Sequence, residues 1–139
     1  MGLLATSASA ERDRRTLFLA QLLFWMLCAP DGHAKNFSLA ILPRGAYALT
    51  PLYDVMSAWP LIGEAPDKLS WHKVRMAMAI RTRNAHWKMK DIQPRHWMEI
   101  GKRYGVLDDG GRTVEALIDH VVAGIEPAVM RFYPHVRVE

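Results

Sequence analysis

An apolar run, Leu17–Pro30, is the feature that most restricts how this chain can fold, and only Gln21 interrupts it. The run is shorter than the roughly 20 residues that a membrane-spanning helix needs. Polar residues precede it and apolar residues then cover nearly every face, which predicts a buried central helix over 11–27. Ser9 or Asp13 is expected to cap this helix. The terminal proline is expected to end it, because the residue before a proline avoids the helical region.

Three oxygen-bearing side chains flank a predicted β-hairpin that follows this helix: Asp31, Asn36 and Asp54. The hairpin is indicated by two short, β-favouring apolar runs, 37–42 and 47–52, separated by a turn that contains Pro and Gly. Antiparallel strands lie about 4.8 Å apart, so the two ends of the hairpin are neighbours. The sequence therefore predicts that the asparagine and the second aspartate lie close together.

This set of side chains is typical of phosphoryl transfer from a magnesium nucleotide. One carboxylate accepts the proton of the substrate hydroxyl, while an amide oxygen and a second carboxylate hold the metal. In protein kinases these residues occur in the motif H-R-D-L-x-x-x-N, followed by D-F-G, and the Asp and the Asn of the first motif have the same spacing as here. Here the corresponding tripeptides are Ala29-Pro30-Asp31 and Asp54-Val55-Met56, so the generic match is partial. Alone, Pro-Asp-Gly is usually a turn; the three residues together favour the catalytic interpretation.

The longer motifs around these residues resemble the C-terminal lobe of HipA-type serine/threonine kinases, the toxins of HipA–HipB modules. The two motifs are D-G-H-A-K-N-F-S-L and, after it, L-T-P-L-Y-D-V-M-S-A-W-P. The likeness begins near Leu3 and continues to Pro94–Trp97 before it fades. The resemblance implies ATP and Mg²⁺ as cofactors, a protein substrate, a HipB-like DNA-binding antitoxin as partner, and a cytoplasmic location. It also implies the helical lobe of a kinase-like fold, so we expect a mainly α chain with one β-hairpin.

The phosphate-covering part of a kinase has no counterpart in the sequence. Neither G-x-G-x-x-G nor G-x-x-x-x-G-K-[ST] occurs. We therefore expect a single domain, residues 1–139, that corresponds to a truncated enzyme or to its C-terminal lobe alone. The N-terminal lobe is then missing or is supplied by a separate polypeptide.

Five side chains carry predicted roles under this resemblance. Asp31 is the expected general base. His33 occupies a place where many kinases carry a lysine that steadies the transferring phosphate, and it could contact phosphate or Asp54. Lys35 could pair with phosphate as a point charge. Asn36 and Asp54 are the expected Mg²⁺ ligands and bind the nucleotide through it. The plainer alternatives are a structural loop histidine, a solvated lysine, an asparagine turn and a helix-capping aspartate.

The rest of the chain predicts further short elements. A turn of helix is expected at 54–59 and an alternating strand at 74–80, although the latter spacing also suits a helix. Pro94 suits the first position of a helix that runs to Arg103 and ends at Gly105. Thr113 is expected to cap a last helix with apolar residues at helical spacing as far as Val129.

Composition separates the remaining classes of function. Cys28 is the only cysteine and cannot form an intrachain disulfide, so we expect it in the core of a chain that tolerates a reducing cytosol. The six histidines show no zinc-type pairing.

One rival interpretation is an inactive, partner-binding lobe. Another is a nucleic-acid binder, but the formal net charge of +4 is modest and direct binding is not expected. Its candidate residues surround Trp87: Arg75, Arg81, Arg83, Lys88 and Lys90.

Overall fold

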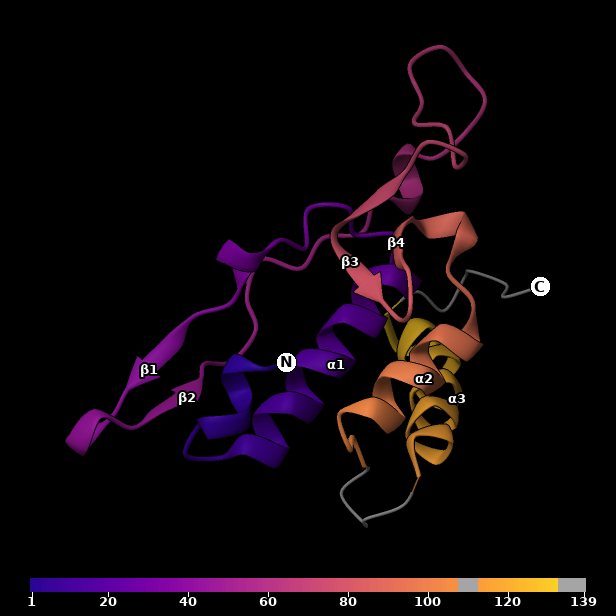
Figure 1. Ribbon diagram of the computed structural model, residues 1–139. Coiled ribbons are helices and arrows are strands. Elements are labelled where there is room, and N and C mark those ends of the chain that lie inside the picture. Colours follow the sequence, from indigo (N-terminus) through magenta and orange to yellow (C-terminus); the bar gives the residue numbers. More distant parts are fainter. Residues whose placement is uncertain (108–112, 133–139) are drawn as a thin grey trace.

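The fold is a small mixed α/β domain whose longest buried helix lies between two β-hairpins (Figure 1). The computed structural model describes residues 1–107 and 113–132, the last eight as backbone only. No helix in these ranges is long and apolar enough to cross a membrane. The elements run in the order α1 (Ala10–Met26), β1 (Leu39–Ile41), β2 (Tyr47–Leu49), β3 (Arg75–Arg81), β4 (Ala85–Lys88), α2 (Pro94–Arg103) and α3 (Val114–Phe132). Short 3₁₀ turns precede α1 and follow α1, β1, β2 and β4.

The described residues form two antiparallel two-stranded sheets, whereas the sequence predicted one hairpin. The predicted hairpin is present as β1 and β2, with Leu39 opposite Leu49 and Ile41 opposite Tyr47. The strand predicted at 74–80 is also present, as β3. Its partner β4 was missed because it has only four residues, too few for a clear strand pattern, and its burial does not alternate. The fold is therefore mixed α/β, whereas a mainly α fold was predicted.

The end of α1 is set by backbone geometry at Cys28 and comes before the proline. Cys28 has a φ of 49°, in the left-handed region. Its N–H donates to the carbonyl of Trp25 at 3.1 Å, and the N–H of Ala29 donates to that of Phe24 at 2.7 Å. These two bonds form the Schellman arrangement that closes many helices. The prediction of a buried cysteine is confirmed, since Cys28 is fully buried, and burial raises the pKa of its thiol.

Residues 54–59 do not form the predicted turn of helix. Their polar groups instead bond to the exposed carbonyls at the end of α1. Ser57 Oγ donates to the carbonyl of Leu27 at 2.7 Å, and the N–H of Ala58 donates to that of Cys28 at 3.0 Å. Trp59 Nε1 donates to the carbonyl of Met26 at 2.8 Å. The segment after Asp54 is thus tied to the same helix end from which Asp31 projects.

The core lies where α1 meets the second hairpin and α2. Trp97 of α2 is 1% exposed, and its ring lies 5.8 Å from the rings of Phe18 and Trp25 of α1. Trp25 also donates from Nε1 to the carbonyl of Met89 at 3.0 Å, which joins α1 to the end of the second hairpin. The other buried apolar residues around this contact are Leu22, Phe24, Met76, Ile80, Ile92 and Ile100.

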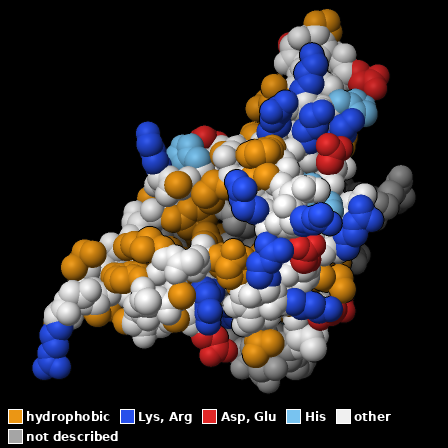
Figure 2. Space-filling view, viewed as in Figure 1, with side chains coloured by type: hydrophobic (Ala, Val, Ile, Leu, Met, Phe, Trp, Pro, Cys, Tyr) orange, Lys and Arg blue, Asp and Glu red, His pale blue; other side chains and the backbone are white. Residues whose placement is uncertain are grey.

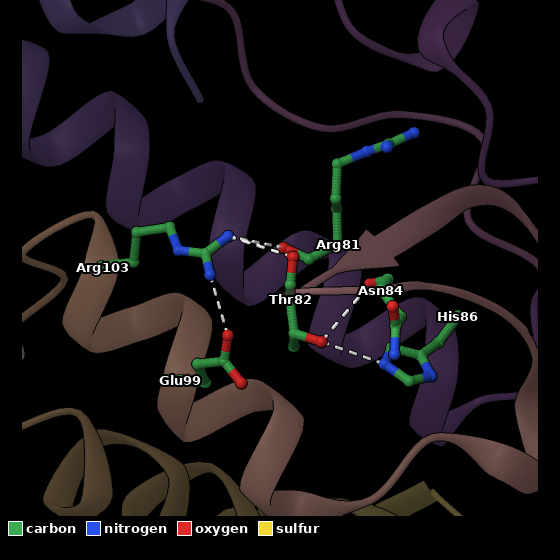
Figure 3. A network of polar contacts seen from close by, with 6 residues as sticks. All are labelled: Arg81, Thr82, Asn84, His86, Glu99 and Arg103. Atoms are coloured by element: carbon green, nitrogen blue, oxygen red, sulfur yellow. Dashed lines mark hydrogen bonds and ion pairs between the residues drawn. The ribbon is translucent and has the colours of Figure 1, made fainter.

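A polar network fastens α2 to the β3–β4 turn (Figure 3). Arg103 donates to the carbonyls of Arg81 and Thr82, at 3.3 Å and 3.2 Å, and pairs with Glu99 at 2.8 Å. Thr82 Oγ1 lies 3.0 Å from His86 Nε2. The helix predicted from Pro94 to Arg103 is confirmed, and its last turn holds the hairpin end in place.

The last helix packs closely on α2. A Cβ added to Gly101 would lie 2.1 Å from Val114 Cγ2, so the two helices meet where only glycine fits. Lys102 Nζ pairs with Glu115 Oε1 at 2.6 Å, and this bond lowers the pKa of the glutamate. Thr113 caps α3 as predicted, because its Oγ1 accepts from the N–H of Ala116 at 3.4 Å. The predicted apolar positions at the end of α3, including Val129, lie outside the described side chains.

Candidate functional site

Asp31 lies on a loop that is pressed against the central helix. Gly32 is buried, and a Cβ at this position would lie 2.2 Å from Phe24 Cδ2 of α1. The N–H of Gly32 donates to the carbonyl of Ala29 at 3.4 Å. The side chain of Asp31 itself is 76% exposed. The loop therefore fixes the backbone beside a carboxylate that remains open to an incoming group.

Asn36 is the buried centre of the site, with an exposure of 3%. Its Oδ1 accepts from the N–H of His33 at 3.2 Å, and its Nδ2 donates to Asp54 Oδ2 at 3.4 Å. The structure thus brings Asn36 and Asp54 together across the first hairpin, as the strand pairing predicted. It also links the asparagine to the loop that carries Asp31.

The backbone of Asp54 is held in an unusual conformation, with a φ of 57°. Asp and Asn tolerate this left-handed region better than most residues do, at a small energetic cost, and such positions cluster at functional sites. Asp54 is also the point where the chain turns from the hairpin toward the end of α1. The sequence suggested a helix cap at this position, but no helix follows it.

His33 lies beside Asp31. Its Nε2 is 3.6 Å from Asp31 Oδ1, while its Nδ1 is buried without a hydrogen-bond partner in the described part of the chain. No contact joins it to Asp54 among the described residues, so the suggested donation to that carboxylate is not observed. Lys35 is exposed, and its ammonium group contacts no partner within the described ranges. Four of the five predicted residues thus form one chain of contacts, Asp31–His33–Asn36–Asp54, and the side chain of Lys35 is not part of it.

Two residues that the sequence analysis gave no role at the site hold this arrangement together. Tyr53 donates from its hydroxyl to the carbonyl of Lys35 at 2.7 Å and contacts Ser38 Oγ at 2.9 Å. Asp13 of α1, which is 3% exposed, accepts from the N–H of Leu49 at 2.9 Å. The tyrosine closes the base of the hairpin and the aspartate pins β2 to the central helix. In the sequence, the one indication of a role for Tyr53 was its position directly before Asp54.

The donor set fits a magnesium ion. Mg²⁺ prefers oxygen ligands and is commonly held by one or two carboxylates, with the remaining positions filled by phosphate and water. Asp54 supplies a carboxylate that is exposed to solvent. Asn36 Oδ1 has one hydrogen bond and keeps a second lone pair for a ligand. Asp54 therefore offers an exposed carboxylate to a hard cation, whereas the Asn36 amide turns its nitrogen toward that carboxylate and its oxygen toward the N–H of His33.

A comparison with protein families shows which family the chain belongs to. The sequence matches the family described as HipA-like C-terminal domain over residues 1–129, which is nearly the whole chain. The matched range includes the Asp31 loop, both hairpins, α2 and most of α3. The chain belongs to the HipA-like C-terminal domain family.

Proposed function

We propose that this chain is the catalytic C-terminal lobe of a HipA-like serine/threonine kinase, which transfers a phosphoryl group from Mg-ATP to a protein hydroxyl. The observation that carries the proposal is the 3.4 Å contact between Asn36 and Asp54, linked through His33 to the loop of Asp31. A carboxylate base next to an amide–carboxylate pair is the arrangement that this chemistry uses. In the same proposal the protein is the toxin of a toxin–antitoxin module.

The side chains divide the work by their exposure. Asp31 projects into solvent, where it accepts the proton of a serine or threonine hydroxyl and orients that oxygen toward the phosphate. His33 restrains the carboxylate from the side, and Lys35 offers a positive charge to phosphate oxygens. Asn36 and Asp54 would hold a magnesium ion, which would supply positive charge to neutralise the phosphates.

Two partners belong to the proposal. The lobe that covers the nucleotide phosphates in kinases is supplied by a further part of the protein or by a second polypeptide. A HipB-like antitoxin is the proposed regulatory partner. Both follow from the family and not from a contact within this chain.

Substitution of the two aspartates tests the proposal. In the complete enzyme, Asp31→Ala and Asp54→Ala are each expected to lower phosphoryl transfer about 100-fold or more, because each removes a group that acts on the reacting atoms. Transfer is measured with radiolabelled ATP and protein substrate. Asp67→Ala removes an exposed aspartate of another loop and is the matched control. Near-normal turnover in either site variant, with the control also normal, would reject the assignment.

A second candidate function is a partner-binding lobe without activity, and the first hairpin favours it. The three residues of β1 are apolar and all exposed, and Ile41 reaches 78%. Figure 2 shows hydrophobic side chains along this projecting hairpin. Exposed apolar patches on soluble domains often mark contact surfaces. Self-association that disappears in Ile41→Asp, together with absence of phosphoryl transfer, would favour this function over the kinase.

A further inference from the structure

A groove lies next to the loop that carries the candidate base. Pro30, which precedes Asp31 in the chain, is one of its lining residues, and Leu69 and Val74 contribute further apolar lining. The remaining long side chains of the lining are Lys68, Lys73 and Arg75. The groove therefore combines an apolar surface with three cations, and one of its lining residues directly precedes the proposed reacting aspartate in the chain.

These cations belong to an unusually one-sided part of the sequence. Residues 68–90 contain seven Lys and Arg residues and no Asp or Glu. All seven are exposed in the structure. Figure 2 shows Lys and Arg side chains spread over this end of the molecule. Because the whole chain has a formal charge of only +4, the positive charge is concentrated in residues 68–90, which supply six of the seven residues that line the groove.

The fold brings like charges together here without compensation. Arg75 lies directly opposite Lys88 in the β3–β4 pairing, and like charges in that relation destabilise a sheet. Lys68 donates to the carbonyl of Pro60 at 3.1 Å, which fixes its ammonium group at the groove without neutralising it. Among the described residues, neither Lys73 nor Arg75 forms an ion pair.

The carboxylates nearest in the sequence do not neutralise the groove. Glu64 and Asp67 lie in the same loop as Lys68 and are exposed. No ion pair joins them to the groove cations in the described part of the chain. An anionic partner would therefore meet uncompensated charge and would relieve the repulsion between Arg75 and Lys88.

We propose that this groove binds an acidic segment of the protein substrate, next to the hydroxyl that is phosphorylated. The proposal rests on the proposed function and names the substrate class of that same site. The target hydroxyl must come within about 3 Å of Asp31. An extended peptide advances about 3.3 Å per residue, so the residues that flank the hydroxyl pass along Pro30 into the groove. Carboxylates pair with the three cations while apolar side chains contact Leu69 and Val74.

A peptide explains this location better than a nucleic acid does. A nucleic acid attracted by the positive segment would gain no binding energy from being close to Asp31. A peptide whose hydroxyl is to be phosphorylated, in contrast, must come close to Asp31. The two occupants also differ in what they need: a peptide uses the apolar lining, and a phosphate backbone does not.

Binding of unphosphorylated peptides to the complete protein tests the docking site without using catalysis. Fluorescent serine peptides with acidic, neutral or basic flanks are titrated without ATP. We expect the acidic peptide to bind at least about tenfold more tightly than the neutral one, as complementary charge allows. The double variant Lys73→Glu/Arg75→Glu should lose this preference and gain affinity for the basic peptide. Arg83→Glu, at the far turn of the same positive segment, is the matched control and should retain the preference.

Several results would overturn the docking site. These are equal affinity for all three peptides, an equal loss in Arg83→Glu, or displacement of the acidic peptide by a single-stranded oligonucleotide of the same charge that itself binds more tightly. Phosphorylation of the same peptides separates the two proposals. Charge-selective binding without any phosphorylation would keep the docking site and reject the kinase. Phosphorylation that needs Asp54 but ignores the flanking charge would keep the kinase and reject the docking site.

Discussion

The two hairpins are both antiparallel but differ in what they contribute. The second hairpin buries Met76 and Ile80 against α1 and α2 and belongs to the core. The first hairpin exposes all of β1, and a hydrogen bond from the N–H of Leu49 to Asp13 joins it to the helix. The difference shows that a hairpin can serve to position side chains at its ends, here Asn36 and Asp54, while it adds little to the buried core.

This comparison makes predictions about where stability and activity reside. Substitutions in the contact between the second hairpin, α1 and α2 should lower the free energy of unfolding. Substitutions around the first hairpin should affect activity more than folding. The predictions below run from the largest expected change in stability to the smallest.

Trp97→Ala should cause the largest loss. The side chain is 1% exposed and packs on two aromatic rings of α1, so its removal leaves a cavity and should cost about 3–5 kcal/mol of unfolding free energy. Urea denaturation followed by circular dichroism measures the loss. Ile41→Ala in the first hairpin, where the side chain is 78% exposed, should change stability by less than about 0.5 kcal/mol. Equal losses in the two variants would remove the distinction between the hairpins.

Gly32→Ala should cause the next largest loss of stability, and it should also lower activity. A Cβ would lie 2.2 Å from Phe24, so the Asp31 loop or the ring must shift. Overpacking of this kind costs about 1–3 kcal/mol, and the displaced loop should also reduce phosphoryl transfer in the complete enzyme. Gly124→Ala has nothing within 4 Å and serves as control. A fully stable and active Gly32→Ala protein would contradict the close packing of this loop.

Tyr53→Phe should change stability little and activity more. It removes the hydroxyl that bonds to the carbonyl of Lys35 and to Ser38, a loss of about 1 kcal/mol. Because this hydroxyl closes the base of the first hairpin, we expect weaker Mg-ATP binding, measured by calorimetry. Ser38→Ala removes only one of the two contacts and should have a smaller effect. The opposite order of effects would show that Tyr53 does not position the site.

A smaller, pH-dependent effect should arise where α2 meets the second hairpin, because the rings of His96 and His86 stack with their centroids 4.0 Å apart. Burial lowers the pKa of His96, and the neighbouring His86 and Arg95 lower it further, while Glu99 acts in the opposite direction. The unfolded chain therefore binds the proton more readily than the folded chain. The contribution of His96 to stability is complete above its ordinary pKa of 6.5 and is lost as pH falls toward the lower, folded-state pKa.

Urea midpoints measured between pH 7.5 and pH 5 would show this effect as a difference between proteins. Carboxylates also begin to titrate in this range, so the parent protein is compared with His96→Gln. We expect the decline on acidification to be shallower in the variant. An identical decline in both proteins would exclude His96 as its source.

The sequence predicted those parts of the fold that depend on local signals. The apolar run, the N1 proline at Pro94 and the cap at Thr113 gave the three helices, and the Pro/Gly turn gave the first hairpin. The errors lie where tertiary contacts decide the backbone. Residues 54–59 bond to the end of α1 instead of forming a helical turn. Cys28 ends α1 in a conformation that no local residue preference indicates.

The candidate site shows the same division. Strand pairing was enough to predict that Asn36 and Asp54 meet, since both lie at the open end of one hairpin. The contact of His33 with Asp31 depends on how the loop folds over Phe24, and it could not be read from the sequence. The role of Tyr53 was missed because its partners, Lys35 and Ser38, lie far back in the sequence, just before the first strand of the hairpin.

Titration of Mg-ATP into the purified 139-residue chain by calorimetry is the most direct test of the central claim that Asn36 and Asp54 form a metal–nucleotide site. Asp54→Ala, Asp67→Ala and a magnesium-free run complete the set. The account predicts heat of binding in the parent chain and in Asp67→Ala, and none in Asp54→Ala or without magnesium. Binding that is unchanged in Asp54→Ala, or absent from a well-folded parent chain, would contradict the claim.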